Sequence, residues 1–428
     1  MSYYTLPSIH IDFNQLNLLL TTKFITPVNK TYKNDQSNVN DQYIVNDESN
    51  VNDQNIIVSK TLHLYLIRAK ENIGKYPTEW DKFKKYTNPY EFIHGIIPGT
   101  NHSVSCLKPL SRSFYKMIEI CNILNILNDL PKSINSFHLA EGPGGFIEAL
   151  LKLRNNRNDN YYGMTLINDT DVNVPGWKKS NNFLLKNENV IIEKGYDQKG
   201  DITNPDNLMY CYNKYNNTIN IITADGGFDF TSDFNNQESS MIKLILCQIA
   251  FAIAIQKKEG TFIIKFFNTF SKISIDMIYL LSLIYEEVNF VKPNTSRYGN
   301  SEKYIVCKKF KLNTNSTYDL MLKLYIIIKG LNDGYELVSL FNFELPLFFI
   351  NKIEEYNAIY GQQQLENISN TINLIITNNS SNKNLHDKLE TIKKNNINKC
   401  INWCKLNNIP YTKDLQLSTN IFNSRKNK

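Results

Sequence analysis

The sequence lacks an apolar run long enough for a membrane span, an apolar N-terminal leader and closely paired cysteines. Its longest apolar stretch, residues 244–255, is shorter than the ~18 residues that a membrane-spanning helix needs, and it includes Gln248. The N-terminus carries no basic region followed by an apolar block, so we expect no secretory signal. The 7 cysteines are odd in number and scattered, which argues against a disulfide framework. These absences predict an intracellular protein, cytoplasmic or nuclear, without membrane contact.

The charge balance and the hydrophobic content are those of a soluble globular chain. Lys and Arg number 47 against 41 Asp and Glu, and 42% of the 428 residues are hydrophobic. This composition excludes collagen-like and wholly disordered classes, and the length predicts roughly two to three structural units. Cys400 and Cys404 lie about one helical turn apart, but the nearest histidine in the sequence is His386. We therefore interpret the two cysteines as one face of a helix and predict no metal site.

The residue pattern divides the chain into three parts. Residues 1–95 form an N-terminal appendage with a low-complexity insertion at 34–56, in which the hexamer SNVNDQ occurs twice. Residues 96–312 alternate between long amphipathic runs and short apolar runs. Residues 313–428 form a helical C-terminal region with a basic tail at 424–428; its helical runs are 318–328, 347–360, 367–377 and 385–406.

The alternation within residues 96–312 predicts an α/β fold with a Rossmann-like, doubly wound parallel sheet. The segment 286–291 precedes the last expected strand by a short polar loop, which predicts a hairpin and hence one antiparallel strand. We expect strands at 136–140, 161–166, 190–193, 219–224, 260–265 and 303–308, and helices at 111–130, 146–154, 238–256 and 274–287.

A glycine-rich turn follows the first expected strand of this sheet. The segment EGPGGF at residues 141–146 joins that strand to a helix, at the carboxyl edge where open α/β sheets bind ligands. It departs from the dinucleotide pattern G-x-G-x-x-G and from the phosphate-binding pattern G-K-[ST], which argues against NAD and ATP. A plain tight turn is the structural alternative to a ligand-binding loop.

Charged residues follow later strands at the same expected edge. Asp225 comes directly after the apolar strand 219–224, Lys265 ends the strand 260–265, and Asp201 lies in a Gly-Asp loop. Each residue alone fits a solvated strand end equally well. Their joint occurrence beside the glycine turn indicates a site.

With these segments in view, residues 108–310 resemble the FtsJ-like (RrmJ-type) S-adenosylmethionine-dependent RNA 2'-O-ribose methyltransferases. The resemblance is greatest to the mRNA cap-specific branch of eukaryotes and large DNA viruses. It is carried by EGPGGFIEAL at 141–150, GDITNPDNL at 200–208, TADGGFD at 223–229, and a block that runs from LILCQ at 244–248 through FIIKFF at 262–267 to KPNTSRYGNSEKYIVCK at 292–308. The segments are collinear and span about half of the protein.

The resemblance implies a cofactor and site residues. The family's Lys-Asp-Lys-Glu catalytic tetrad corresponds to Lys116, Asp225, Lys265 and Glu302. Glu141 is a departure, because the cap branch more often has a small residue at this position. The S-adenosylmethionine cofactor is expected at Gly142, Pro143, Gly144, Gly145 and Phe146 for its methionine part and at Asp201 and Ile202 for its adenosine, with Asp225 and Ser111 at its edge; RNA is expected at Lys292, Ser296, Arg297 and Asn300.

The resemblance also implies a function and a partner. It implies methyl transfer to a ribose 2'-hydroxyl of RNA, at the cap-proximal nucleotide of mRNA, with the capped 5' end as the partner. The same chemistry on rRNA or tRNA and a non-catalytic RNA-binding subunit remain as alternatives. The basic and aromatic segment at 80–86 is consistent with RNA binding, and equally with a solvated face. The Asn-, Ile- and Lys-rich composition and the viral relatives of the branch suggest a viral source, with a virion or viral factory as a further location.

Overall fold

The computed structural model describes residues 3–9, 20–25, 56–168, 170–171, 174–227, 237–379 and 385–413. The predicted insertion, apart from Ile56, and the predicted basic tail lie outside these ranges. A central sheet of eight strands has the order β1-β8-β9-β7-β6-β3-β4-β5, and β2 and β10 form a second sheet. The strands are β1 Tyr3–Thr5, β2 Leu20–Ile25, β3 Asn135–Leu139, β4 Asn160–Met164, β5 Val190–Ile192, β6 Ile219–Ala224, β7 Gln256–Phe266, β8 Tyr285–Val291, β9 Lys303–Phe310 and β10 Glu336–Phe341.

The central sheet confirms the predicted α/β architecture. Strands β5, β4, β3, β6 and β7 are mutually parallel, whereas β9 runs antiparallel to both β7 and β8, as the hairpin pattern predicts. The sequence did not predict β1, which pairs antiparallel with β8 at the sheet edge. A strand of three residues is too short to show a periodic apolar pattern. Its pairing partner, Val291, lies nearly 290 residues away in the sequence, so neighbouring residues give no sign of the pairing.

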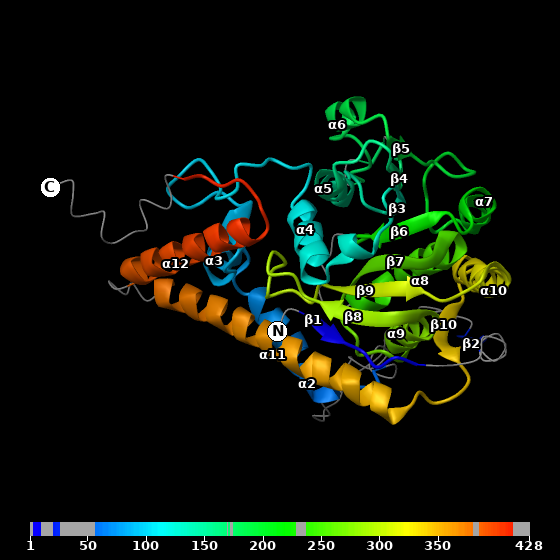
Figure 1. The fold of residues 1–428 in the computed structure, drawn as a ribbon. Helices are drawn as coiled ribbons and strands as arrows, with labels where there is room; N and C mark the ends of the chain where they lie inside the picture. Colours follow the sequence, from blue (N-terminus) through cyan, green and yellow to red (C-terminus); the bar gives the residue numbers. More distant parts are fainter. Residues whose placement is uncertain are drawn as a thin grey trace, which may run out of the picture.

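Helices cover both faces of the sheet (Figure 1). Helices α4 and α5 pack on one face, and α7, α8, α9 and α10 pack on the other. The expected helix at 111–130 is interrupted, because Asn125 adopts a left-handed φ of 50° that ends the regular helix. The helices are α4 Ser113–Ile123, η3 Ile126–Asp129, α5 Gly145–Arg154, α6 Asn181–Lys186, α7 Pro205–Tyr215, α8 Gln237–Ile255, α9 Lys272–Ile284 and α10 Thr314–Asn332.

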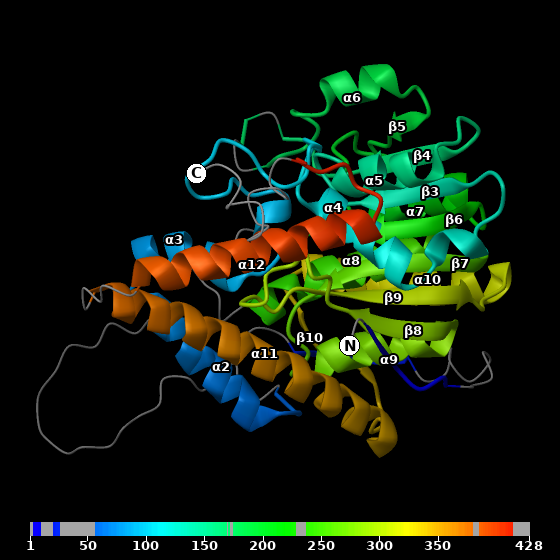
Figure 2. The ribbon, with the colours of Figure 1, turned by 60° about the vertical axis from the view of Figure 1, so that its left-hand side comes forward.

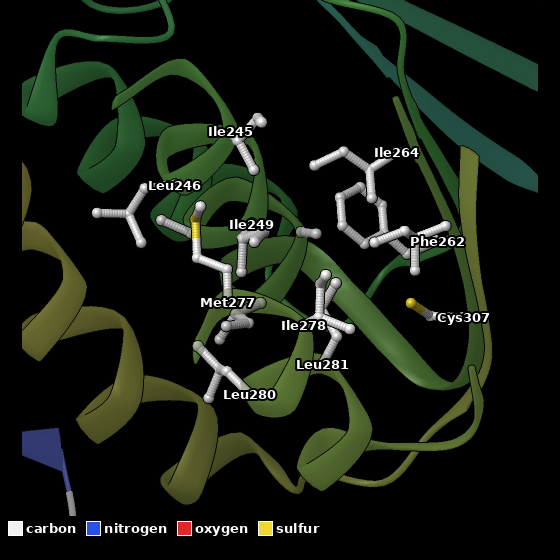
Figure 3. Packing of buried hydrophobic residues seen from close by; sticks show 14 of the residues in the cluster. Ile245, Leu246, Ile249, Phe262, Ile264, Met277, Ile278, Leu280, Leu281 and Cys307 are labelled. Atoms are coloured by element: carbon white, nitrogen blue, oxygen red, sulfur yellow. The ribbon is translucent and has the colours of Figure 1, made fainter. Parts of the chain in front are cut away.

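The parallel strands are apolar on both faces. Ile222 and Ile264 belong to the cluster under α8 and α9, while the preceding residues Ile221 and Ile263 belong to the cluster under α4 and α5. Figure 3 shows side chains of α8 and α9 gathered opposite Phe262 and Ile264. By length and composition residues 238–255 of α8 could cross a membrane, but 72% of that stretch is buried in the structure, as in a core helix.

The N-terminal and C-terminal parts of the chain lie side by side (Figure 2). Helices α2 (Lys60–Ile73) and α3 (Pro77–Thr87) pack against α11 (Leu347–Asn379), and α12 (Leu385–Leu406) packs against α3 and the short helix η2 (Glu91–Ile93). The two helical runs expected at 347–360 and 367–377 form this single helix α11, since the intervening segment contains helix-forming Gln and Leu. Gly361 lets α2 approach closely, because a Cβ there would lie 2.6 Å from Leu62 Cδ2.

Candidate active site

A cavity of about 1020 Å³ opens at the carboxyl ends of β3, β6 and β7. Its lining includes Gly142 of the glycine turn, Asp201, and three of the four predicted tetrad residues, Asp225, Lys265 and Glu302. The parallel strands end at one edge of the sheet, which explains why residues distant in the sequence meet here.

The four predicted tetrad residues form two lysine–carboxylate pairs. Lys116 Nζ donates to Glu302 Oε2 at 2.9 Å and lies 2.7 Å from Oε1. Lys265 Nζ lies 3.3 Å from Asp225 Oδ1 and donates to the backbone oxygen of Asp225 at 2.7 Å. Asp225 and Lys265 follow β-paired residues, since Ala224 of β6 pairs with Ile264 of β7. The register of two parallel strands therefore brings one pair together.

The tetrad lies largely out of contact with water. Lys116, Lys265 and Glu302 are all less than a tenth exposed. Burial alone raises the pKa of Glu302, but the ammonium groups of Lys116 and Lys265 outweigh it and hold that pKa well below its usual value. Glu302 is therefore a carboxylate at neutral pH.

Tyr304 is a further component of the site that the sequence analysis missed. Its hydroxyl donates to Asp225 Oδ1 at 2.8 Å, and its ring packs against Phe146 of the glycine turn with centroids 5.7 Å apart. Lys116 Nζ lies 5.9 Å from the centroid of the same ring. Tyr304 lies two positions after Glu302, at the start of β9. That spacing was the available signal.

Helix α4 contributes a second buried group, Glu119. Its carboxylate accepts hydrogen bonds from Asn294 N and Nδ2 at 2.8 and 2.7 Å, and from Thr295 N and Oγ1 at 3.1 and 3.0 Å. Glu119 lies three residues after Lys116, so both side chains share one face of the helix. Helix α4 thus holds the loop between β8 and β9 at two points.

The glycine turn requires its glycines. Gly144 has a φ of 102°, a conformation that side chains disfavour. A Cβ on Gly145 would lie 2.2 Å from Ser111 Oγ, and a Cβ on Gly142 would lie 2.4 Å from the backbone oxygen of Gly176. Ser111 therefore lies directly against the turn. Pro143 follows a cis peptide bond, and its backbone oxygen accepts from Ser180 Oγ at 2.6 Å.

The Gly-Asp loop forms another wall of the cavity. Asp201 Oδ1 accepts from Thr203 N and Oγ1, both at 2.8 Å, and Ile202 is buried beside it. Gly200 has a φ of 63°, and a Cβ there would lie 2.3 Å from the backbone oxygen of Thr165. The apolar residues Leu166, Val174, Pro175 and Ile202 line the same region of the cavity.

Glu141, the departure from the family pattern, does not line the cavity. Its side chain is buried and bonded to the hydroxyl of Thr223, and its second oxygen lies 3.5 Å from His138 Nδ1. Burial raises the pKa of Glu141. The Glu141 side chain therefore points away from the cavity, toward Thr223 and His138, and does not occupy the space beside the glycines.

The residues expected to bind RNA separate into two groups. Asn300 is exposed and Arg297 is partly exposed, and both line the cavity. Arg297 also forms a double hydrogen bond with Glu91, at 2.6 and 3.0 Å. Burial alone raises the pKa of Glu91, but Arg297 and Arg112 outweigh it and lower that pKa to about 2. The Arg297–Glu91 pair joins the cavity wall to helix η2.

Ser296 and Lys292 form the second group. Ser296 is buried, and its hydroxyl donates to Glu302 Oε1 at 2.6 Å. Lys292 Nζ donates to backbone oxygens of the loop that carries Glu302. Neither residue lines the large cavity. Within the described ranges, no group of three or more His, Cys, Asp or Glu residues could hold a metal ion.

Part of the chain is similar to a known protein family. Residues 109–310 match the family described as FtsJ-like methyltransferase. A mouse protein named cap-specific mRNA (nucleoside-2'-O-)-methyltransferase 1 is 30% identical over 298 residues, which cover 65% of this chain and 34% of that protein. A Drosophila melanogaster protein named cap-specific mRNA (nucleoside-2'-O-)-methyltransferase 2 is 26% identical over 284 residues, which cover 62% and 40%.

The chain thus spans about a third of the length of the mouse relative. Among solved structures, one described as a ribosomal RNA methyltransferase from Plasmodium falciparum has 22% identity and a TM-score of 0.35, and the match covers 48% of this chain and 100% of that one. The family match includes the glycine turn, both lysine–carboxylate pairs and the loop that joins β8 to β9. Residues 109–310 form a domain of the FtsJ-like methyltransferase family.

Proposed function

We propose that the chain transfers a methyl group from S-adenosylmethionine to a ribose 2'-hydroxyl of RNA, at the cap-proximal nucleotide of mRNA. The observation that carries this proposal is the pair of buried lysine–carboxylate contacts, Lys116–Glu302 and Lys265–Asp225, which lie at one cavity with the glycine turn. The names of the mouse and fly relatives support the cap-proximal position.

The residues of the cavity fit the cofactor. The glycine turn lets a ligand approach the backbone, which suits the polar methionine part. The apolar residues beside Asp201, including Leu166 and Ile202, suit a flat adenine, and the Asp201 carboxylate suits a hydroxyl-bearing ribose. When bound, S-adenosylmethionine supplies a methyl group on a sulfonium sulfur, which leaves as a neutral thioether.

The two lysines have different roles toward the ribose hydroxyl. Lys265 lies at the end of β7 and lines the cavity, so its neutral amine can accept the proton as the ribose oxygen forms its bond to carbon. Asp225 holds Lys265 Nζ through both its side chain and its backbone oxygen. Lys116 contacts Glu302, adds a positive charge near the cavity and orients the Glu302 carboxylate. Holding hydroxyl and methyl group in line supplies much of the remaining acceleration.

The cavity extends beyond the tetrad to the two appended parts of the chain. Lys70 of α2, Trp80 and Lys84 of α3, and Asn367 of α11 line it together with three of the tetrad residues. Aromatic rings stack on unpaired bases and lysines neutralise phosphates, so this wall suits a single-stranded RNA end. A wall from segments outside the family domain favours a capped mRNA over the substrates of compact single-domain enzymes.

The experiment is transfer of labelled methyl to two short RNAs that differ only in a 5' 7-methylguanosine cap, with Lys265→Ala as control and nuclease digestion to locate the label. We expect label on the first or second ribose of the capped RNA alone, and its loss in the variant. Equal label on both RNAs would indicate an rRNA or tRNA methyltransferase. No label, despite tight cofactor binding, would indicate a non-catalytic RNA-binding subunit.

A further inference from the structure

The loop at residues 292–302 joins β8 to β9 and ends with Glu302. The side chain of its first residue, Lys292, is bonded to two of its last three residues, Asn300 and Glu302. Lys292 Nζ donates to Asn300 O at 2.7 Å, to Asn300 Oδ1 at 2.8 Å and to Glu302 O at 2.6 Å. A lysine ammonium has three N–H donors, so these three acceptors use all of them.

The surroundings of Lys292 support a role inside the protein. Burial lowers the pKa of Lys292, and the positive charges of Lys303 and Lys116 lower it further, against the effect of Glu302. The lysine lines a small second cavity behind the loop, beside Lys303 and Tyr356, and not the large cavity. An ammonium with no donor left and no access to the large cavity is poorly placed to bind RNA.

Other contacts hold different parts of the same loop. Glu119 binds Asn294 and Thr295 at the first turn, and Glu91 binds Arg297 in the middle. The carboxylate of Glu302 is held by Lys116 and Ser296. Among the described residues, Lys292 is the side chain that bonds to the backbone of Glu302 outside the sheet.

We propose that Lys292 is a positioning residue of the reaction, which acts through Glu302 and does not contact RNA. This inference rests on the proposed function, because it takes Glu302 as part of the catalytic group. Lys292 fixes the backbone of Glu302, and Lys116 and Ser296 then fix its carboxylate. The carboxylate in turn sets the position of the Lys116 ammonium beside the cavity.

The test compares Lys292→Met with Lys308→Met in the full chain. Lys308 lies further along β9 and pairs with Asp129 at 2.5 Å, so its variant makes the same charge change away from the site. We expect Lys292→Met to lower kcat at least about tenfold, because a small misplacement of a catalytic group costs that much. The KM for capped RNA and the cofactor affinity should stay within about twofold, and Lys292→Arg, which keeps N–H donors, should recover part of kcat. Lys308→Met should match the wild type.

Amide hydrogen exchange over residues 299–303 gives a readout that does not depend on activity. It should quicken in Lys292→Met and not in Lys308→Met. Unchanged exchange and kcat would overturn the inference, as would a raised KM for RNA at constant kcat, which would indicate an RNA contact. If Lys292→Met loses cofactor binding, the second variant is Asn300→Ala, which removes one acceptor of the Lys292 ammonium, and its kcat is measured at saturating RNA. A lower kcat supports the inference, and an unchanged kcat overturns it. If the wild type transfers no methyl group, the proposed function fails, and exchange alone tests the contact of Lys292 with the loop.

Discussion

The hydroxyl of Tyr304 donates to the Asp225 oxygen that also lies 3.3 Å from the Lys265 ammonium. One carboxylate oxygen therefore accepts from a neutral donor on β9 and faces a cation on β7. Since Lys265 and Tyr304 are direct partners in the register of these antiparallel strands, the sheet itself fixes this arrangement.

Replacing Tyr304 by Phe should slow the reaction without unfolding the protein. Loss of a hydrogen bond to a charged group costs about 1.5 kcal/mol, so we expect kcat to fall roughly tenfold. Tyr285→Phe is the matched control, because its buried hydroxyl donates to Gln256 Oε1 far along the sheet. It should lose stability but keep kcat. Equal kcat in both variants would contradict a role for Tyr304.

Lys265→Ala should abolish methyl transfer and leave cofactor binding intact. Removal of a general base costs on the order of 100-fold or more in rate. Single-turnover transfer measures the rate, and calorimetry with S-adenosylmethionine measures binding. Lys257→Ala removes an exposed lysine from the same strand and should behave as wild type. Near-normal turnover by folded Lys265→Ala would show that the proton goes elsewhere.

Gly144→Leu should weaken cofactor binding by about tenfold or more, because the turn adopts a positive φ and a side chain would fill its surroundings. Its Cβ would lie 3.2 Å from the ring of Trp177. Gly334→Leu is the control for backbone strain, since Gly334 has a φ of 89° but nothing within 4 Å of a Cβ. Unchanged affinity of Gly144→Leu in calorimetry would refute the assignment of the turn to the cofactor.

The free energy of unfolding should depend on pH through Glu91. Its pKa is about 2 in the folded chain, below the value of about 4.3 expected on unfolding, so its contribution is present above pH ~4.3 and is lost as the pH falls toward 2. The shift corresponds to on the order of 3 kcal/mol. Urea unfolding between pH 7 and pH 2 should show a smaller loss for Glu91→Gln than for wild type. Glu286→Gln, at a half-exposed pair with Lys309, should show no such difference.

Trp80→Ala should raise the KM for RNA and leave cofactor affinity unchanged. Loss of one base–aromatic stacking contact costs about 1–3 kcal/mol, or roughly fivefold to 100-fold in affinity. Tyr65→Ala removes an exposed aromatic ring from α2 that does not line the cavity, and should have no effect. A parallel rise in both variants would mean that the appended helices act only through general RNA attraction.

The sequence predicts the residues that follow strand ends, and it does so for a physical reason. Asp225 and Lys265 each come directly after or at the end of an apolar strand, and parallel strands end at one edge, so local pattern alone brings them near each other. The bounds of the long helices α8 and α12 were predicted to within one residue. Helix α8 is a long apolar run, and α12 is a long run with apolar residues at helical spacing.

Contacts between distant segments were not predictable in this way. Glu119 and Asn294 are 175 residues apart, and Glu91 and Arg297 are 206 apart. Neither glutamate breaks the local helical pattern, so nothing in the neighbouring residues indicates burial. The hydrogen bonds from Lys292 to Asn300 and Glu302 were also not predictable, since a lysine after a strand most often lies in solvent.

The wall formed by α2, α3 and α11 has a consequence for biogenesis. Helices α2 and α3 leave the ribosome before strands β3 to β9 of the central sheet, but α11, against which they pack, leaves after all of these strands. The half of the cavity that we propose for the methyl donor is complete once β9 has formed, whereas the half that we propose for RNA also needs α11, which begins almost 290 residues after the start of α2. Under the proposed function, a nascent chain therefore completes the cofactor half of the cavity before the RNA half, so the two halves form at different times during synthesis.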